Sequence, residues 1–297
     1  MRSLHLLRSL RDPSDRLLGA LMLAPAAVLL GGIVVYPVAR LVLTSLTDLD
    51  LSTGLPGRFV GLQNYALLWQ DPSFRHSLFA TLLITFVTVP GAMAAGLGMA
   101  LLANLPFRRK WPVRLALLMP WAMPLAFIGL IFAWFFNGEY GVVNDVLRRL
   151  GLAQHIWFNS VSWSFFAICI TVTWKASSFV ALILLAGLQA IPAELYEAAA
   201  IDGAGRFRQF RAITLPLLRP AIAVALIFRT IAALQTFDIP FTMTKGGPGD
   251  ATETLAMYVY RTTVDNLALG QGATLAVALA VLSLGMSVLY LRQIRAA

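Results

Sequence analysis

Residues 78–105 read LFATLLITFVTVPGAMAAGLGMALLANL, and this stretch decides the class of fold because it holds no charged residue. It is longer than the roughly 20 residues that a helix needs to cross a bilayer. Arg75 and His76 precede it and Arg108 follows it. In lipid an isolated segment must satisfy its own backbone hydrogen bonds, which favours a helix. We therefore predict a transmembrane helix over residues 78–105.

Five further stretches have the same character. They cover about residues 17–43, 115–136, 161–190, 217–237 and 269–291. The composition agrees, since 59% of the 297 residues are hydrophobic and 12% are charged, whereas about a quarter of a soluble domain is charged. The first stretch exceeds the roughly 7–15 apolar residues of a signal peptide, so we expect it to be retained. The sequence predicts an all-α, polytopic membrane protein with six transmembrane helices in one domain, residues 1–297.

The positions of Lys and Arg predict the orientation of these spans. With a cytoplasmic N-terminus, fourteen basic residues lie in inside segments, seven lie outside, and Lys175 and Arg229 lie within spans. The outside ones are Arg40, Arg58, Arg75, Arg148, Arg149, Lys245 and Arg261. Positively charged loops stay in the cytoplasm, so both termini are expected there. The net charge of +9 is thereby explained by the orientation, and no nucleic-acid partner is expected.

The sequence lacks the motifs of an enzyme. It has no G-x-x-x-x-G-K-[ST] loop to hold the phosphates of ATP. The three histidines lie in separate segments and Cys169 is the single cysteine, which excludes the common metal-binding and disulfide patterns. We expect no catalytic residue and no metal site in this chain.

The cytoplasmic loop 191–220 carries most of the functional information. Glu194 and Glu197 favour the positive end of a short helix, and Gly203 is able to take the left-handed conformation that ends one. A second helical stretch follows, which we expect to stop at Pro216 and Pro220. Such a hairpin, with small residues at its tip, is suited to insertion into a cleft of a partner. An ordinary connector between two spans is the alternative.

This loop resembles the EAA loop of the membrane subunits of bacterial ABC importers. The resemblance rests on Glu197-Ala198-Ala199, Asp202-Gly203-Ala204, Phe210, Ile213, Leu215-Pro216 and Pro220. The segments Phe228-Arg229-Thr230, Phe237-Asp238 and Thr244 to Pro248 are similar to the carbohydrate branch of that family, above all to the maltose-type first permease. The resemblance implies the type I ABC importer permease fold.

The resemblance also implies a set of partners. This chain would pair with a second, homologous permease subunit in a heterodimer within the lipid bilayer of a bacterial or archaeal inner membrane. Two copies of an ABC ATPase would bind ATP and Mg, so this chain itself would hold no cofactor. An extracytoplasmic solute-binding protein would deliver a sugar. Glu197, Ala198, Ala199, Asp202 and Gly203 would couple the chain to the ATPase.

A self-sufficient secondary transporter or channel subunit is the alternative function, in which Lys175 and Arg229 would serve ion coupling. Charged residues within spans are costly and indicate function by default. Arg229 is open to two interpretations, a contact with the substrate or a structural partner for a neighbouring helix. Gln235 and Asp238 offer hydrogen bonds to a sugar, or else solvation at the membrane interface.

Further residues are also singled out from the sequence. Trp134 lies in an aromatic third span, where it would stack on a sugar or belong to the interfacial aromatic belt. Pro120 and Pro124 predict a kink in the same span. Gly246-Gly247-Pro248 must form a turn, which is either a contact for the binding protein or a plain loop. The pairs Ala92 with Gly96 and Ala94 with Gly98 predict close helix packing, and a short helix is expected over 142–150.

Overall fold

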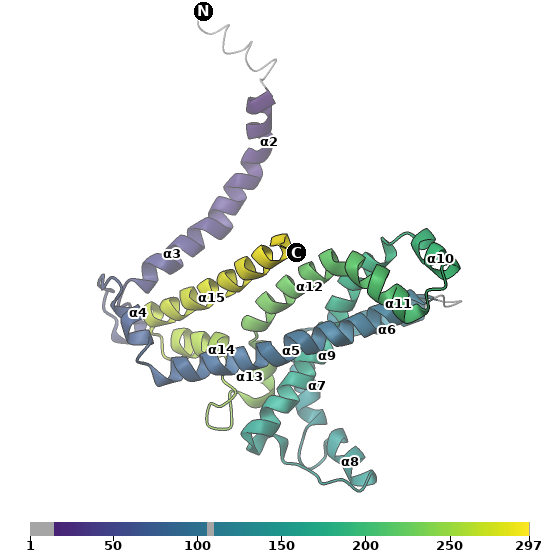
Figure 1. The fold of residues 1–297 in the computed structure, drawn as a ribbon. Helices are drawn as coiled ribbons and strands as arrows, with labels where there is room; N and C mark the ends of the chain where they lie inside the picture. The colour runs from purple at the N-terminus through teal and green to yellow at the C-terminus, as the bar shows by residue number, and fades with distance from the viewer. Residues whose placement is uncertain (1–14, 106–109, 297) are drawn as a thin grey trace, which may run out of the picture.

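The computed structural model describes residues 15–105 and 110–296, and in these residues the fold is helical throughout (Figure 1). No strand occurs in these two ranges, apart from an isolated β-bridge between Thr47 and Phe59. The prediction of an all-α fold is confirmed.

In the described part of the chain, five helices are long and apolar enough to cross a membrane. The first combines α2 (Asp15–Leu30), a π turn (Gly31–Val35) and α3 (Tyr36–Ser45). The others are α5 (Pro72–Asn104), α9 (Val161–Gln189), α12 (Leu215–Leu234) and α15 (Leu269–Ala296). They correspond to the predicted spans 17–43, 78–105, 161–190, 217–237 and 269–291. Most of the predicted ends differ from the observed helix ends by a few residues.

The third predicted span, 115–136, is not one helix. It consists of α6 (Lys110–Ala122) and α7 (Leu125–Phe135), which are separated at Met123 and Pro124. Pro124 lacks a backbone N–H and has an extended conformation (ψ 140°), and a proline also disfavours helical geometry in the preceding residue. The predicted kink is therefore a complete break.

The second helix of the hairpin in the loop 191–220 does not stop at Pro216 and Pro220, so that prediction was wrong. It runs from α11 (Arg206–Gln209) through a π turn (Phe210–Thr214) directly into α12. The π turn absorbs the change of hydrogen-bond register. Pro216 lies just after this π turn and Pro220 lies inside α12, so both prolines are accommodated within a continuous helix.

Shorter helices lie between the long ones. They are α4 (Gln63–Leu68), α8 (Val142–Arg149), α10 (Ala193–Ile201), α13 (Asp238–Thr244) and α14 (Leu255–Tyr260). The expected helix over 142–150 is confirmed as α8, and Gly151 follows it with a φ of 71°.

Helix α9 is the centre of the bundle, since α5, α6, α7, α12 and α13 all pack against it. The α5–α9 contact is the most extensive, and Ala92 and Val180 are fully buried there. Gly96 permits this approach, because a Cβ atom at Gly96 would lie 2.6 Å from Cγ1 of Val180 and 2.9 Å from the carbonyl oxygen of Ser177. Gly98 has no such neighbour within 4 Å, so among the residues that the structure describes the predicted close contact is made by the Ala92–Gly96 pair and not by Gly98.

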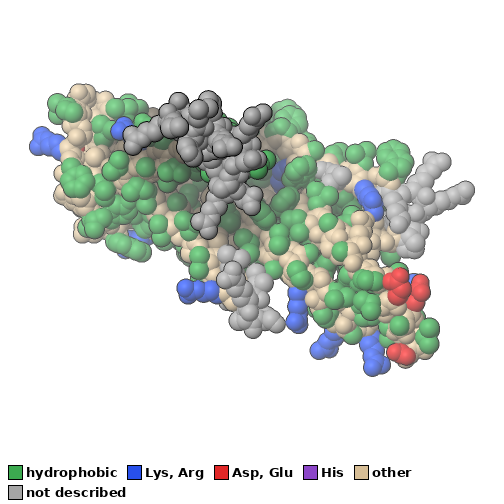
Figure 2. All heavy atoms as spheres, turned by 90° about the horizontal axis from the view of Figure 1, so that it is seen from above, with side chains coloured by type: hydrophobic (Ala, Val, Ile, Leu, Met, Phe, Trp, Pro, Cys, Tyr) green, Lys and Arg blue, Asp and Glu red, His purple; other side chains and the backbone are tan. Residues whose placement is uncertain are grey.

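The outer surface of the bundle is apolar. Figure 2 shows hydrophobic side chains across most of the visible face, with Lys and Arg near its margins. The first long helix stands apart from the bundle over its α2 half (Figure 1), and none of its apolar stretch is buried within the chain. Lipid or another chain must cover such a surface.

Gly96 provides a test of the α5–α9 packing. We expect Gly96→Ala to lower the free energy of unfolding by about 1–3 kcal/mol, because the backbone carbonyl of Ser177 cannot rotate away. The measurement is the midpoint of thermal unfolding of the purified chain in detergent. Gly98→Ala is the matched control on the same helix and should leave the midpoint unchanged or slightly raised. Equal midpoints for the two variants would contradict the packing.

Candidate functional site

A pocket of about 550 Å³ lies between three parts of the bundle. Its walls are the break between α6 and α7, the middle of α9, and the junction between α12 and α13. Four polar residues that we singled out from the sequence line it together: Lys175, Arg229, Gln235 and Asp238. Trp134 does not line it, and its side chain is 71% exposed on α7.

Two helix breaks border this pocket. The first is at Met123–Pro124, and the second is the segment 235–237 between α12 and α13. Backbone without helical hydrogen bonds is tolerated at membrane depth only where it is buried in protein or lines a cavity. The placement of both breaks at the pocket follows this rule.

The side chain of Lys175 caps the helix end at the first break. Its Nζ donates hydrogen bonds to the carbonyl oxygens of Pro120 (2.7 Å), Trp121 (2.6 Å) and Met123 (2.9 Å). These carbonyls stand at the C-terminal end of α6 and lack helical partners because α6 stops there. An ammonium group has three N–H donors. All the donors of Lys175 are therefore occupied by the protein itself.

Arg229 lies in the wall formed by α12 and is 6% exposed. One of its terminal nitrogens donates to the hydroxyl of Thr88 on α5 at 2.9 Å, and its Nε has no hydrogen-bond partner. Within residues 15–105 and 110–296 no carboxylate forms an ion pair with it. The structure thus joins Arg229 to a neighbouring helix by one hydrogen bond, and its buried Nε is left without a partner among the described residues.

The rest of the lining is amphipathic. Gln235 is exposed and Asp238 is half-buried, and both stand at the end where α12 gives way to α13. Phe179, Phe228 and Phe237 contribute aromatic surface to the pocket. An apolar cavity with a few convergent polar groups is typical of small-molecule sites.

The hairpin in the loop 191–220 has the predicted shape. Helix α10 ends at Ile201, and Gly203 follows with a φ of 76°. The N–H of Ala204 donates to the carbonyl of Ala199 at 2.8 Å, which closes the turn. Gln209 holds the hairpin from the other arm, since its Nε2 donates to the carbonyl of Ala204 at 3.0 Å.

The tip of this hairpin is open to a partner. Glu197, Ala198, Asp202 and Gly203 are exposed, and Ala199 is half-exposed. Two large apolar side chains at the tip, Ile201 and Phe207, are 88% and 78% exposed. An exposed apolar patch of this kind is typical of an interaction surface.

At the far end of α13, Gly246, Gly247 and Pro248 form the predicted turn. Gly246 has a φ of 91°, and its carbonyl accepts the N–H of Thr252 at 2.9 Å. The hydroxyl of Thr252 also donates to the carbonyl of Gly247 at 2.8 Å. The turn is therefore fixed by its own loop.

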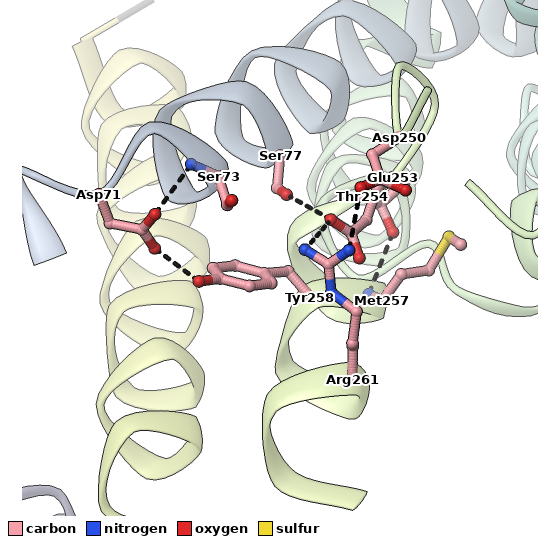
Figure 3. A network of polar contacts seen from close by, with 9 residues as sticks. All are labelled: Asp71, Ser73, Ser77, Asp250, Glu253, Thr254, Met257, Tyr258 and Arg261. Atoms are coloured by element: carbon pink, nitrogen blue, oxygen red, sulfur yellow. Dashed lines mark hydrogen bonds and ion pairs between the residues drawn. The ribbon is translucent and has the colours of Figure 1, made fainter. Parts of the chain in front are cut away.

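A polar network that the sequence did not reveal anchors this loop (Figure 3). Arg261 pairs with Glu253 at 2.9 Å and with Asp250 at 3.1 Å, and Ser77 on α5 donates to Glu253 at 3.4 Å. Beside them, the Tyr258 hydroxyl donates to Asp71 at 2.5 Å. Since Ser77 and Glu253 are 176 positions apart, no local pattern indicates the contact.

Burial sets the ionisation of the network. It raises the pKa of the Glu253 carboxyl, and the positive charge of Arg261 opposes this shift. Burial and the hydrogen bond to Asp71 raise the pKa of Tyr258 to about 12. The neighbouring charges therefore act in opposite directions: Arg261 lowers the pKa of Glu253, whereas Asp71 raises the pKa of Tyr258. Among the described residues, no group of three or more His, Cys, Asp or Glu side chains is placed to hold a metal ion.

Comparison with known proteins gives consistent results. The family described as "Binding-protein-dependent transport system inner membrane component" matches residues 92–295. The sulfoquinovosyl glycerol transport system permease protein SmoG of Agrobacterium fabrum is 62% identical, over 96% of this chain and 92% of its own length. The trehalose/maltose transport system permease protein MalF of Thermococcus litoralis is 39% identical over 93% of this chain and 92% of its own.

The fold also matches a solved structure. The structure of a bacterial ABC transporter involved in the import of the acidic polysaccharide alginate contains a chain that superposes with a TM-score of 0.83. The match covers 98% of both chains at 22% sequence identity, so the likeness is one of fold.

Lys175 provides a test of the α6–α7 break. We expect Lys175→Met to lower the unfolding free energy by about 2 kcal/mol or more, because three carbonyls lose a charged donor. Thermal unfolding of the purified chain in detergent measures this. Lys245→Met, at an exposed loop position, removes the same charge and should have little effect. A Lys175→Met variant as stable as the wild type would contradict the capping function.

Arg261 provides a test of the loop anchor. We expect Arg261→Met to lower the free energy of unfolding by about 1–3 kcal/mol, since it leaves the carboxylate of Glu253 buried without its cation. Thermal unfolding of the purified chain in detergent measures this. Arg148→Met breaks a pair with Asp145 whose arginine side chain is 66% exposed, and exposed pairs contribute little. The double variant Arg261→Met with Glu253→Gln should recover part of the loss. No recovery would show that the charge pairing is not the cause.

Proposed function

Because this chain belongs to the family of binding-protein-dependent transport system inner membrane components, we propose that it is the permease subunit of an ATP-driven sugar importer. The family match carries the proposal, since residues 92–295 include both the pocket and the cytoplasmic hairpin. The pocket is the substrate pathway, and the hairpin is the contact with a separate ATPase that hydrolyses ATP.

In this proposal the chain crosses an inner membrane six times, with both termini in the cytoplasm. Helices α6 and α7 together form the third crossing. They have 13 and 11 residues, which at 1.5 Å per residue makes about 36 Å of helix, enough for a hydrocarbon core of about 30 Å. The break between them then falls within the membrane, and the pocket lies at the depth of the middle of α9.

Coupling follows from the exposed tip of the hairpin. Glu197, Ala198, Ala199, Asp202 and Gly203 dock in a cleft of the ATPase, with Ile201 and Phe207 adding apolar contact. The hairpin leads without interruption into α12, which carries Arg229 into the pocket. ATP binding moves the chain between inward-open and outward-open states only to the extent that nucleotide binds one state better.

The remaining partners occupy other surfaces. A second, homologous permease completes the pathway, and it or lipid covers the exposed α2–α3 helix. A solute-binding protein contacts the turn of Gly246, Gly247 and Pro248 on the opposite side from the hairpin. Two ATPase copies hold the ATP and Mg, so this chain has no cofactor of its own.

The substrate is a sugar or glycoside. The relatives named above are a sulfoquinovosyl glycerol permease and a trehalose/maltose permease, and the aromatic surface of the pocket suits sugar rings. The higher identity, 62%, makes sulfoquinovosyl glycerol the first compound to test. A self-sufficient transporter is less well supported, because the donors of Lys175 are occupied by α6 and are not free for ion coupling.

The coupling site is tested by Gly203→Asp. We expect ATP-dependent uptake by the reconstituted complex to fall to the level without ATP, and co-elution with the ATPase to be lost, while membrane insertion is unchanged. Asp tolerates the left-handed conformation of Gly203, and no atom lies within 4 Å of an added Cβ, so the hairpin itself is preserved.

Gly151→Asp is the matched control. Gly151 has a similar φ of 71° and equally open space, but it follows α8 on the other side of the membrane, so uptake should be normal. Full uptake by Gly203→Asp would refute the coupling assignment. Uptake by this chain alone in proteoliposomes without ATP would refute the importer proposal and support the self-sufficient transporter.

A further inference from the structure

A separate pocket, of about 240 Å³, lies between α6 and α9 and shares no lining residue with the pocket described above. Its walls are mainly apolar and include Leu117, Leu182 and Leu185, and its polar lining includes Arg114 and Gln189. Arg114 stands near the beginning of α6 and Gln189 is the last residue of α9, so the polar end of the pocket is at the end of the bundle that carries the α10–α11 hairpin (Figure 1).

The charge of Arg114 has no counterpart in the walls of this pocket. Neither α6 nor α9 contains an acidic residue, and within residues 15–105 and 110–296 no carboxylate forms an ion pair with Arg114. The residue is half-buried, and partial withdrawal of a guanidinium from water is costly unless an anion compensates for it. The pocket therefore favours an anion that comes from outside the described chain.

The surroundings of Arg114 are those of a residue at the level of the lipid headgroups. Trp111 precedes it on α6 and is 67% exposed, and tryptophan is enriched where a span meets the membrane surface. The sequence directly before Trp111 is Arg108-Arg109-Lys110. Clusters of Lys and Arg at the cytoplasmic end of a span, and basic pockets between spans, bind anionic lipid headgroups. A guanidinium also presents N–H donors in a fork that matches a phosphate.

From these observations we propose that the α6–α9 pocket binds an anionic phospholipid of the cytoplasmic leaflet. The phosphate lies at Arg114 and Gln189, and part of an acyl chain lies along Leu117, Leu182 and Leu185. The lipid thereby joins the beginning of α6 to the end of α9, from which the chain continues into the hairpin. The inference concerns a membrane lipid and not the transported sugar, and only the choice of leaflet rests on the orientation given under the proposed function.

The experiment uses the complete permease–ATPase assembly, delipidated in a neutral detergent. Native mass spectrometry measures the binding of dioleoylphosphatidylglycerol, and dioleoylphosphatidylcholine is the zwitterionic lipid with the same acyl chains. We expect the anionic lipid to bind more tightly than the zwitterionic one. Arg114→Met should weaken the anionic lipid by about fivefold, because one basic residue near the headgroups contributes on that order. Arg114→Lys keeps the charge and should retain most of the affinity.

Arg219→Met is the matched control for charge, since Arg219 is exposed near the beginning of α12 and does not line this pocket. It should leave the affinity for the anionic lipid unchanged, and an equal loss in both Met variants would mean that the lipid responds only to the total charge. Ala186→Phe tests the apolar wall, because Ala186 is exposed and lines the pocket. It keeps Arg114 but fills the space for the acyl chain, so it should also weaken the lipid.

Two further results would overturn the lipid site. Glycerol 3-phosphate that binds as tightly as the lipid, with the same dependence on Arg114, would identify a site for a free anion. Loss of the second permease from the assembly in Arg114→Met, with lipid binding unchanged, would identify a carboxylate of that subunit as the partner of Arg114. The binding measurement needs neither ATP nor a sugar, so its failure would leave the importer proposal intact, and absence of ATP-dependent uptake would not affect the lipid site.

Discussion

The pocket depends on one contact, the capping of three backbone carbonyls by Lys175. Because α6 stops before Pro124, the carbonyls of Pro120, Trp121 and Met123 have no helical partners. Unsatisfied backbone groups in a lipid environment cost several kcal/mol each. The ammonium group satisfies all three and, since Lys175 stands in the middle of α9, it fixes the break against the central helix of the bundle. One wall of the pocket is thereby set.

Two cations therefore line one pocket with different consequences. Both Lys175 and Arg229 are charges within predicted spans, and such charges have the same general interpretation until their contacts are known. The donors of Lys175 are consumed by the protein, which makes it part of the scaffold. Arg229 has one neutral partner and a buried, unpartnered Nε, so the described residues do not compensate its charge. The two residues therefore differ in the number of hydrogen-bond acceptors around them, and not in their charge or in their being within a span.

Apolar length predicted the five long helices because burial in lipid acts on each segment separately. It did not predict the break of the third span, since the stability of that break comes from Lys175, more than 50 positions away. The two prolines led us to end a helix wrongly at Pro216 and Pro220, because the π turn at Phe210–Thr214 depends on backbone register, which the sequence does not display. The turn at Gly203 was predictable from local conformational preference. The Glu253 network was not, because its members come from distant segments.

The two helix breaks also connect the pocket with the loop at its far end. Helices α7 and α13 both begin at the pocket and pack tightly on each other, with no room for a Cβ between Gly129 and Thr242. Helix α13 ends at the Gly246 turn, and Thr254, next to Glu253, donates to the carbonyl of Thr236 in the pocket wall at 2.7 Å. The Arg261–Glu253 pair and Ser77 fasten that loop to α5. The turn and Asp238 thus stand at the two ends of one short helix, and the loop after the turn is bonded to Thr236, so the surface proposed for the binding protein and the proposed ligand pocket are joined by direct contacts.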